Sequence, residues 1–135
     1  MSIAVRYYTR SGNTKKLADS IGAAVGVKAE TVDVPLAERV DILFLGSSVY
    51  AAGVDDSVKK FLADNKDKIG KIVNFSTAAL LPSTYKQVEK LAAANGIAMD
   101  TAEFHCRGSF MMMHKGKPDA EDLKAVTEFA KKVVS

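Results

Sequence analysis

The chain is poor in the residues that hold small secreted folds together. It has one cysteine, Cys106, no tryptophan and three prolines among 135 residues. A lone cysteine excludes a disulfide within the chain, so we expect a reducing, cytoplasmic location. We expect Cys106 itself to be a buried, inert thiol at the end of a strand.

Long apolar runs are also missing. No stretch approaches the roughly 20 apolar residues that a membrane-spanning helix requires. Residues 1–6 lack the basic-then-apolar layout of a secretion signal and have the pattern of a first strand. We therefore expect neither a membrane span nor a targeting segment.

The chain also has no large excess of positive or negative charge. There are 19 basic and 16 acidic residues, which give a formal net charge of +3, and the basic residues are scattered rather than clustered. This distribution argues against a nucleic-acid partner. The two histidines, His105 and His114, are nine positions apart with no evident carboxylate partner, so no metal site is expected.

What the chain does contain is a regular alternation of strand and helix patterns, at a length that suits a single domain, residues 1–135. The expected strands are residues 3–8, 27–34, 40–46, 72–77 and 97–106. The expected helices are residues 14–25, a second from 55 or 56, a third from 82–84 to 96, and a fourth from 118–119 onward. Thr84 and Gln87 fit a capping box at the start of the third helix.

The distribution of polar residues predicts the order of the strands. Residues 40–46 form an apolar run typical of a central strand, whereas residues 27–34 and 97–106 carry the charges typical of edges. This favours the order 2-1-3-4-5 over 3-2-1-4-5, in a doubly wound, five-stranded parallel α/β sheet with helices on both faces. The chain then reverses direction between the first and third strands. A ligand is expected at the carboxyl ends of these strands, beside residues 9–14 and 47–56.

The corner between the first strand and the first helix has the composition of a phosphate site. Residues 9–14 combine one glycine with four hydroxyl or amide side chains, namely Gly12 with Thr9, Ser11, Asn13 and Thr14. Backbone N–H groups at the start of a helix, and the positive end of its dipole, favour a phosphate dianion. The alternative is a plain turn in which Thr14 is only the N-cap and Gly12 only the turn residue.

This corner resembles the first loop of the short-chain flavodoxins, which are FMN-binding electron carriers. The resemblance covers the whole chain in the order of its strands and helices, and it is specific in residues 9–14, followed by Ala18 and Ile21. It implies that the FMN phosphate is held by Thr9, Ser11, Asn13 and Thr14, with Arg10 and Gly12 in the same loop. Arg6 stands where the family usually has an apolar residue; it lies either on a less buried side of the strand or beside an acid.

The resemblance also implies where the flavin ring lies. It places the ring along the second loop, whose expected contacts are Ser47, Ser48, Tyr50, Ala51, Ala52 and Gly53, with the peptide at Gly53 near flavin N5. Tyr50 either stacks on the ring or packs against the second helix. Backbone groups of Ser76, Thr77 and Ala78 are expected at the pyrimidine edge of the ring. This third loop has no aromatic residue before Tyr85, so one face of the ring is expected to be open.

A methionine-rich segment follows the fifth strand. Residues 104–116 include three consecutive methionines, Met111, Met112 and Met113. Methionine suits adaptable contact surfaces, so the segment is either a cover near the flavin or a patch that docks a partner. The alternative, which we favour, is that alternate residues fill the edge of the core between the fifth strand and the last helix.

Two functions follow from the resemblance. The first, which we favour, is a monomeric FMN-binding protein that transfers single electrons between redox partner proteins and has no catalytic residues of its own. The second is an FMN-dependent oxidoreductase acting on a small planar substrate such as a quinone, a tetrapyrrole or a nicotinamide. The net charge of +3 departs from the acidic flavin surroundings of low-potential flavodoxins. A receiver domain is excluded because its acidic residues are missing, and a dinucleotide site has little support because no Gly-x-Gly-x-x-Gly occurs.

Overall fold

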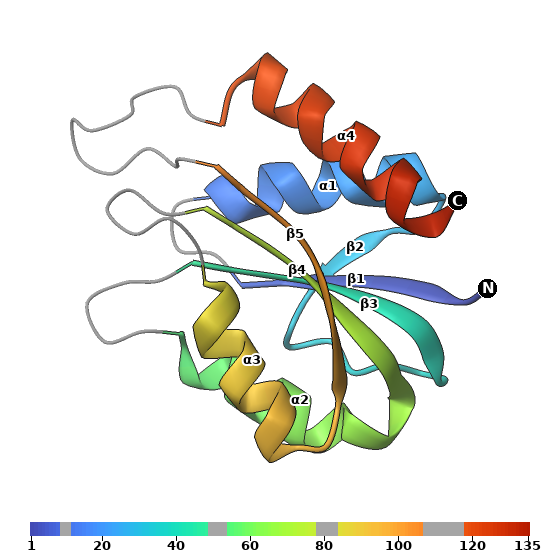
Figure 1. The fold of residues 1–135 in the computed structure, drawn as a ribbon, viewed down its shortest axis with the longest axis vertical. Helices are drawn as coiled ribbons and strands as arrows, with labels where there is room; N and C mark the ends of the chain where they lie inside the picture. The colour runs from blue at the N-terminus through green and yellow to red at the C-terminus, as the bar shows by residue number, and fades with distance from the viewer. Residues whose placement is uncertain (9–11, 49–53, 78–83, 107–117) are drawn as a thin grey trace.

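The computed structural model describes residues 1–8, 12–48, 54–77, 84–106 and 118–135, and it shows the expected alternation of strands and helices (Figure 1). In chain order the elements are β1 (Ile3–Tyr7), α1 (Asn13–Val25), β2 (Ala29–Thr31), β3 (Val40–Ser48), α2 (Asp56–Asn65), a short 3-10 helix (Lys66–Lys68), β4 (Ile69–Thr77), α3 (Tyr85–Ala94), β5 (Ala98–Cys106) and α4 (Ala120–Val134).

The five strands form one sheet in the order β2-β1-β3-β4-β5, and every strand pair is parallel. The predicted doubly wound α/β fold is therefore confirmed, with β3 at the centre and β2 and β5 at the edges. In this order the chain leaves β1 in one direction along the sheet and returns to the other side of β1 at β3. The predicted switch point thus lies between β1 and β3.

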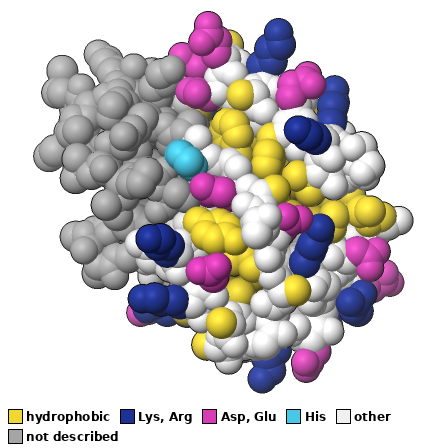
Figure 2. All heavy atoms as spheres, in the orientation of Figure 1, with side chains coloured by type: hydrophobic (Ala, Val, Ile, Leu, Met, Phe, Trp, Pro, Cys, Tyr) yellow, Lys and Arg dark blue, Asp and Glu magenta, His cyan; other side chains and the backbone are white. Residues whose placement is uncertain are grey.

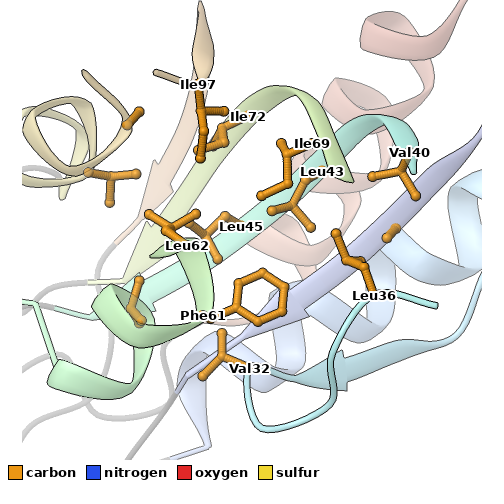
Figure 3. Packing of buried hydrophobic residues seen from close by; sticks show 14 of the residues in the cluster. Val32, Leu36, Val40, Leu43, Leu45, Phe61, Leu62, Ile69, Ile72 and Ile97 are labelled. Atoms are coloured by element: carbon orange, nitrogen blue, oxygen red, sulfur yellow. The ribbon is translucent and has the colours of Figure 1, made fainter. Parts of the chain in front are cut away.

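Two apolar cores lie on the two faces of the sheet. Side chains alternate along β3, so that Leu43 and Leu45 belong to the core under α2 and α3, whereas Phe44 belongs to the core under α1 and α4. Figure 3 shows the first of these cores, with Phe61 and Leu62 of α2 facing the side chains of the sheet. Burial on both faces explains why residues 40–46 form a continuous apolar run.

The second strand is shorter than predicted. The sequence pattern predicts residues 27–34, but only Ala29–Thr31 pair with β1. The chain turns directly after this strand, because the N–H of Val34 donates to the carbonyl oxygen of Thr31 at 3.1 Å. This turn brings Val32 into the core under α2 and α3. The apolar residues that predicted a longer strand are therefore partly core residues of a loop.

Arg6 of β1 is buried beneath the segment that follows β2. Its guanidinium donates to the carbonyl oxygens of Val5 (3.0 Å), Val34 (2.9 Å) and Pro35 (3.3 Å). It also lies 3.4 Å from the carboxylate of Glu30. Burial lowers the pKa of Arg6, and the charge of Glu30 opposes that shift. Of the two predicted placements, the one beside an acid is confirmed and the less buried side is wrong, since Arg6 is only 7% exposed.

Replacing Arg6 by methionine is expected to lower the free energy of unfolding by about 2 kcal/mol, because two loop carbonyl groups lose a charged donor. The matched control is Glu30→Gln, for which we expect a loss below about 1 kcal/mol because the Glu30 side chain is 34% exposed. Urea unfolding followed by circular dichroism measures both. Equal losses in the two variants would show that the ion pair, and not the carbonyl contacts, holds the segment.

Strand β5 carries a bulge that Asp100 stabilises. The register with β4 shifts between Met99 and Glu103. Within this stretch the Asp100 carboxylate accepts from the N–H of Ala102 at 2.9 Å and from Nζ of Lys71 at 2.8 Å. A bulge that carries charged side chains hinders an edge strand from pairing with another chain.

Asp100 gives the stability of the fold a specific dependence on acid. The hydrogen bond from Lys71, followed by that from the Ala102 N–H, lowers the pKa of Asp100. A carboxyl group whose pKa is lowered by folding stabilises the protein above its unfolded pKa of about 3.9, and this contribution is lost as the pH falls further, through the folded pKa. We therefore expect Asp100→Asn to be less stable than the unaltered chain at pH 7, by less than about 1 kcal/mol.

Urea unfolding of both proteins between pH 7 and pH 3 tests this expectation. The difference between them should shrink once the pH drops below about 4. A difference that stays constant over the whole range would mean that Asp100 acts through its shape and not its charge.

Candidate functional site

The carboxyl ends of β1, β3, β4 and β5 and the amino ends of α1, α2, α3 and α4 lie at one edge of the sheet, on the left in Figure 1. Of the residues predicted to bind a cofactor, the structure describes Gly12, Asn13, Thr14, Ser47, Ser76 and Thr77, and the backbone of Ser48. Outside the described residues lie Thr9, Arg10, Ser11, Tyr50, Ala51, Ala52, Gly53 and Ala78, together with Met111, Met112, Met113 and His114. The side chain of Cys106 is not described either.

Helix α1 begins at a glycine and not at Thr14. Gly12 is the N-cap residue, and its φ of 87° is a left-handed conformation that glycine adopts without strain. Thr14 lies inside the first turn, so the interpretation of Thr14 as only the N-cap is wrong. Because Gly12 has no side chain, it supplies no side-chain cap to the helix. The backbone N–H groups and the positive dipole end at the start of a helix favour an anion.

Thr14 is held against the centre of the sheet. Its hydroxyl lies 3.0 Å from the hydroxyl of Thr77 at the end of β4, and both residues are buried. Gly46 of β3 leaves the room for this approach, since a Cβ atom at that position would lie 2.9 Å from Cγ2 of Thr14. The start of α1 is thereby fixed beside the switch point.

The charges around the start of α1 favour an anion. The first turn of this helix, all of it described, carries no acidic residue and contains Lys15 and Lys16. Lys15 is exposed and donates to Asp19 one turn later at 2.7 Å, a hydrogen bond that raises the pKa of Lys15. The positive end of the helix dipole and the lack of an acidic side chain in this described turn therefore both favour an anion.

The hydroxyl groups of Ser47 and Ser76 are used inside the protein. The Ser47 hydroxyl donates to the Thr84 hydroxyl at 3.0 Å, and the Ser76 hydroxyl accepts from the Thr84 N–H at 3.3 Å. Both serines are at most 1% exposed. The two hydroxyl groups therefore belong to the interior, and the backbone contact of Ser76 with a ligand stays a prediction.

The capping box predicted at the start of α3 is wrong. Thr84 is the N-cap residue, but its side chain makes no capping hydrogen bond because it takes part in side-chain contacts. The N–H of Thr84, which a capping box would direct to Gln87, donates to the Ser76 hydroxyl. Oε1 of Gln87 is buried and makes no hydrogen bond within the described part of the chain. A capping box forms instead at the start of α4, between Asp119 and Asp122.

His105 has a carboxylate partner that the sequence interpretation missed. Its Nδ1 atom lies 2.9 Å from Oε1 of Glu103. Figure 2 shows the histidine of the described chain, in cyan, at the surface beside an acidic side chain. Residues two apart on a strand point to the same face, and this spacing is the signal that identifies the pair.

Other kinds of site find little support in the described residues. Among them, no three His, Cys, Asp or Glu side chains gather closely enough to hold a metal ion. Their helices also include none with the length and apolar character to cross a membrane. On the face in Figure 2, basic and acidic side chains are interspersed. An acidic side chain lies near the carboxyl edge of the sheet: Asp56, at the start of α2, is 97% exposed.

The chain matches a known family over most of its length. Residues 4–106 match the family described as flavodoxin domain. An uncharacterized protein of Methanocaldococcus jannaschii is 26% identical over 136 aligned positions, which cover 90% of each chain. The fold is similar to a flavodoxin from Archaea (TM-score 0.79, 18% identity, 98% of this chain and 96% of that chain). It is also similar to the oxidised Flavodoxin 1 of Bacillus cereus (TM-score 0.75, 20% identity, 99% and 97%). The chain therefore belongs to the flavodoxin family.

The donor set at the carboxyl edge fits FMN, which consists of a phosphate joined to a planar ring system. The start of α1 combines the left-handed Gly12, the buried Thr14 and two lysines, a chemistry suited to a phosphate. The ends of β3 and β4 place backbone groups at the same edge, a chemistry suited to the polar rim of the ring. We expect a phosphate half of the site beside β1 and a ring half beside β3 and β4, which are neighbouring strands.

Proposed function

We propose that the chain binds FMN at the carboxyl edge of its sheet and, as a monomer in the cytoplasm, transfers single electrons between redox partner proteins. The observation that carries this proposal is the start of α1, where a glycine begins the helix beside the switch point and no acidic residue follows in the first turn, all of which is described. When bound, FMN supplies the redox chemistry. The residues of the chain anchor the phosphate and hold the ring at the edge of the sheet.

The test is reconstitution followed by a redox titration. The purified chain, mixed with FMN and freed of excess ligand, should be yellow, with the fluorescence of the bound flavin quenched. Reduction followed by visible absorbance should then resolve two separate one-electron steps. A colourless protein would overturn the FMN assignment, and a single two-electron step would overturn the role as a one-electron carrier.

A second candidate is an FMN-dependent oxidoreductase that acts on a small planar substrate. The observation in its favour is the position of Tyr85, the first aromatic residue after β4. Its hydroxyl donates to the backbone carbonyl of Asp100 at 3.0 Å, so the Tyr85 side chain reaches toward the amino end of β5 and away from the carboxyl edge. Steady-state turnover of a nicotinamide and a quinone without any partner protein would favour the enzyme over the carrier.

A further inference from the structure

Five polar side chains form a hydrogen-bonded cluster on the face of the sheet that α2 and α3 cover. The members of this Thr84 cluster come from β3, β4, β5 and the start of α3, and they are Ser47, Asn74, Ser76, Thr84 and Glu103. Thr84 is at the centre, since it is contacted by Ser47, Asn74 and Ser76. At 3.4 Å, Asn74 Nδ2 also donates to Glu103 Oε2. The first four residues are at most 1% exposed, and the Glu103 side chain is 19% exposed.

The cluster is built by the register of the strands. Ser47 pairs with Ser76 across β3 and β4, and Asn74 pairs with Glu103 across β4 and β5. All of these side chains emerge on the face on which Leu45 lines the apolar core. Polar groups at such a place are costly unless each is hydrogen-bonded. The hydrogen bonds therefore define the geometry of the cluster, and we expect a change in one member to alter the positions of the others.

Two members of the Thr84 cluster stand where the ring half of the site begins. Ser47 and Ser76 occupy the ends of β3 and β4, and both contact Thr84, the residue with which α3 begins. We propose that Glu103 is a positioning residue for the flavin ring, acting through Asn74 and Thr84 on the backbone at Ser47 and Ser76. This inference rests on the proposed binding of FMN. It adds that a side chain of the edge strand β5 affects how tightly the flavin ring is bound.

The geometry points to positioning and not to proton transfer. Although the exposed His105 adjoins Glu103, the next link inward is the side-chain amide of Asn74, which is a poor relay for protons. The geometry also separates the ring from the phosphate. Thr14 and Thr77 contact each other on the opposite face of the sheet, which carries Phe75 and is covered by α1. The start of α1, where we expect the phosphate, is therefore held by contacts outside the Thr84 cluster.

The experiment compares FMN with riboflavin, which has the same ring but no phosphate. Glu103→Ala should weaken both ligands by the same factor, about tenfold, because the buried Asn74 amide loses one of its two acceptors and keeps only Thr84. Glu103→Gln keeps an acceptor oxygen in place and should stay within about threefold of the unaltered chain. The matched control is Asp100→Asn, which removes a carboxylate from the same strand outside the cluster and should leave both dissociation constants unchanged. Titration by quenching of flavin fluorescence gives these values.

A double-mutant cycle tests the route through Thr84. Thr84→Val removes the central hydroxyl at nearly constant volume and so interrupts the contacts that join Asn74 to Ser47. If Glu103 acts through Thr84, then Glu103→Ala should add little to the loss of riboflavin affinity in the Thr84→Val background. The midpoint potential of bound FMN should shift in Glu103→Ala and not in Asp100→Asn, a readout that a loss of stability alone does not move.

The outcomes separate the inference from the function on which it rests. Unchanged riboflavin affinity in Glu103→Ala, a loss confined to FMN, or strict additivity with Thr84→Val would overturn the inference and leave FMN binding intact. Failure of the unaltered chain to bind either flavin would overturn the proposed function, and the inference with it.

Discussion

Gly46→Ala is expected to lower the free energy of unfolding by about 3 kcal/mol, at the upper end of the cost of overfilling a packed core. A Cβ atom at this position would lie 2.3 Å from Cε2 and 2.4 Å from Cζ of Phe75, and 2.9 Å from Cγ2 of Thr14. Phe75 is completely buried, so its ring has no free space into which to withdraw. Urea unfolding of the chain without added ligand measures the loss.

The variant Phe75→Leu provides the matched control for this expectation. It removes the ring atoms that the new methyl group would meet, so Gly46→Ala should cost much less in the Phe75→Leu background than in the unaltered chain. A loss below about 0.5 kcal/mol in the single variant would show that the sheet adjusts around the methyl group and that the close approach of α1 to β3 is not required.

The second large effect concerns the phosphate. Replacing Ser11 and Thr14 together by alanine should weaken FMN binding by about a hundredfold or more, because in the proposed complex two hydroxyl groups that hydrogen-bond the phosphate dianion would be lost. Riboflavin binding should change by no more than about threefold, since riboflavin carries no phosphate to lose contacts. Titration of the flavin fluorescence with each protein measures both constants.

Thr77→Val is the control for the phosphate variant. It removes the same contact between Thr14 and Thr77 from the β4 side and leaves the start of α1 unchanged. The ratio of FMN affinity to riboflavin affinity should therefore stay near that of the unaltered chain in Thr77→Val and collapse in the double variant. An unchanged ratio of FMN affinity to riboflavin affinity in the double variant would show that the phosphate does not bind at the start of α1.

The order of the strands could be predicted from the sequence because burial leaves a direct mark on composition. A strand covered on both faces, such as Val40–Ser48, must be apolar at successive positions, and an edge strand need not be. The length of β2 could not be predicted in this way. Its apolar residues contribute to the core from a loop, and long-range contacts hold that loop, among them those of Arg6 with the carbonyl oxygens of Val34 and Pro35.

The candidate site was predictable to the extent that local chemistry determines it. The glycine and hydroxyl residues of the first loop define a helix start, and the structure places Gly12 and Thr14 there. The Thr84 hydroxyl binds the buried side chains of Ser47 and Asn74 and does not cap α3. This could not be predicted, because it depends on the strand register that brings Ser47 and Asn74 together. The competition between a local capping hydrogen bond and these long-range partners is decided by tertiary packing, which a spacing rule does not contain.

A crystal structure of the chain grown with excess FMN would locate the cofactor directly. We expect the phosphate at the start of α1, within hydrogen-bond distance of the backbone N–H groups of residues 12–14, with the ring at the ends of β3 and β4. Crystals in which the start of α1 is empty, or in which FMN occupies a different edge of the sheet, would contradict this expectation.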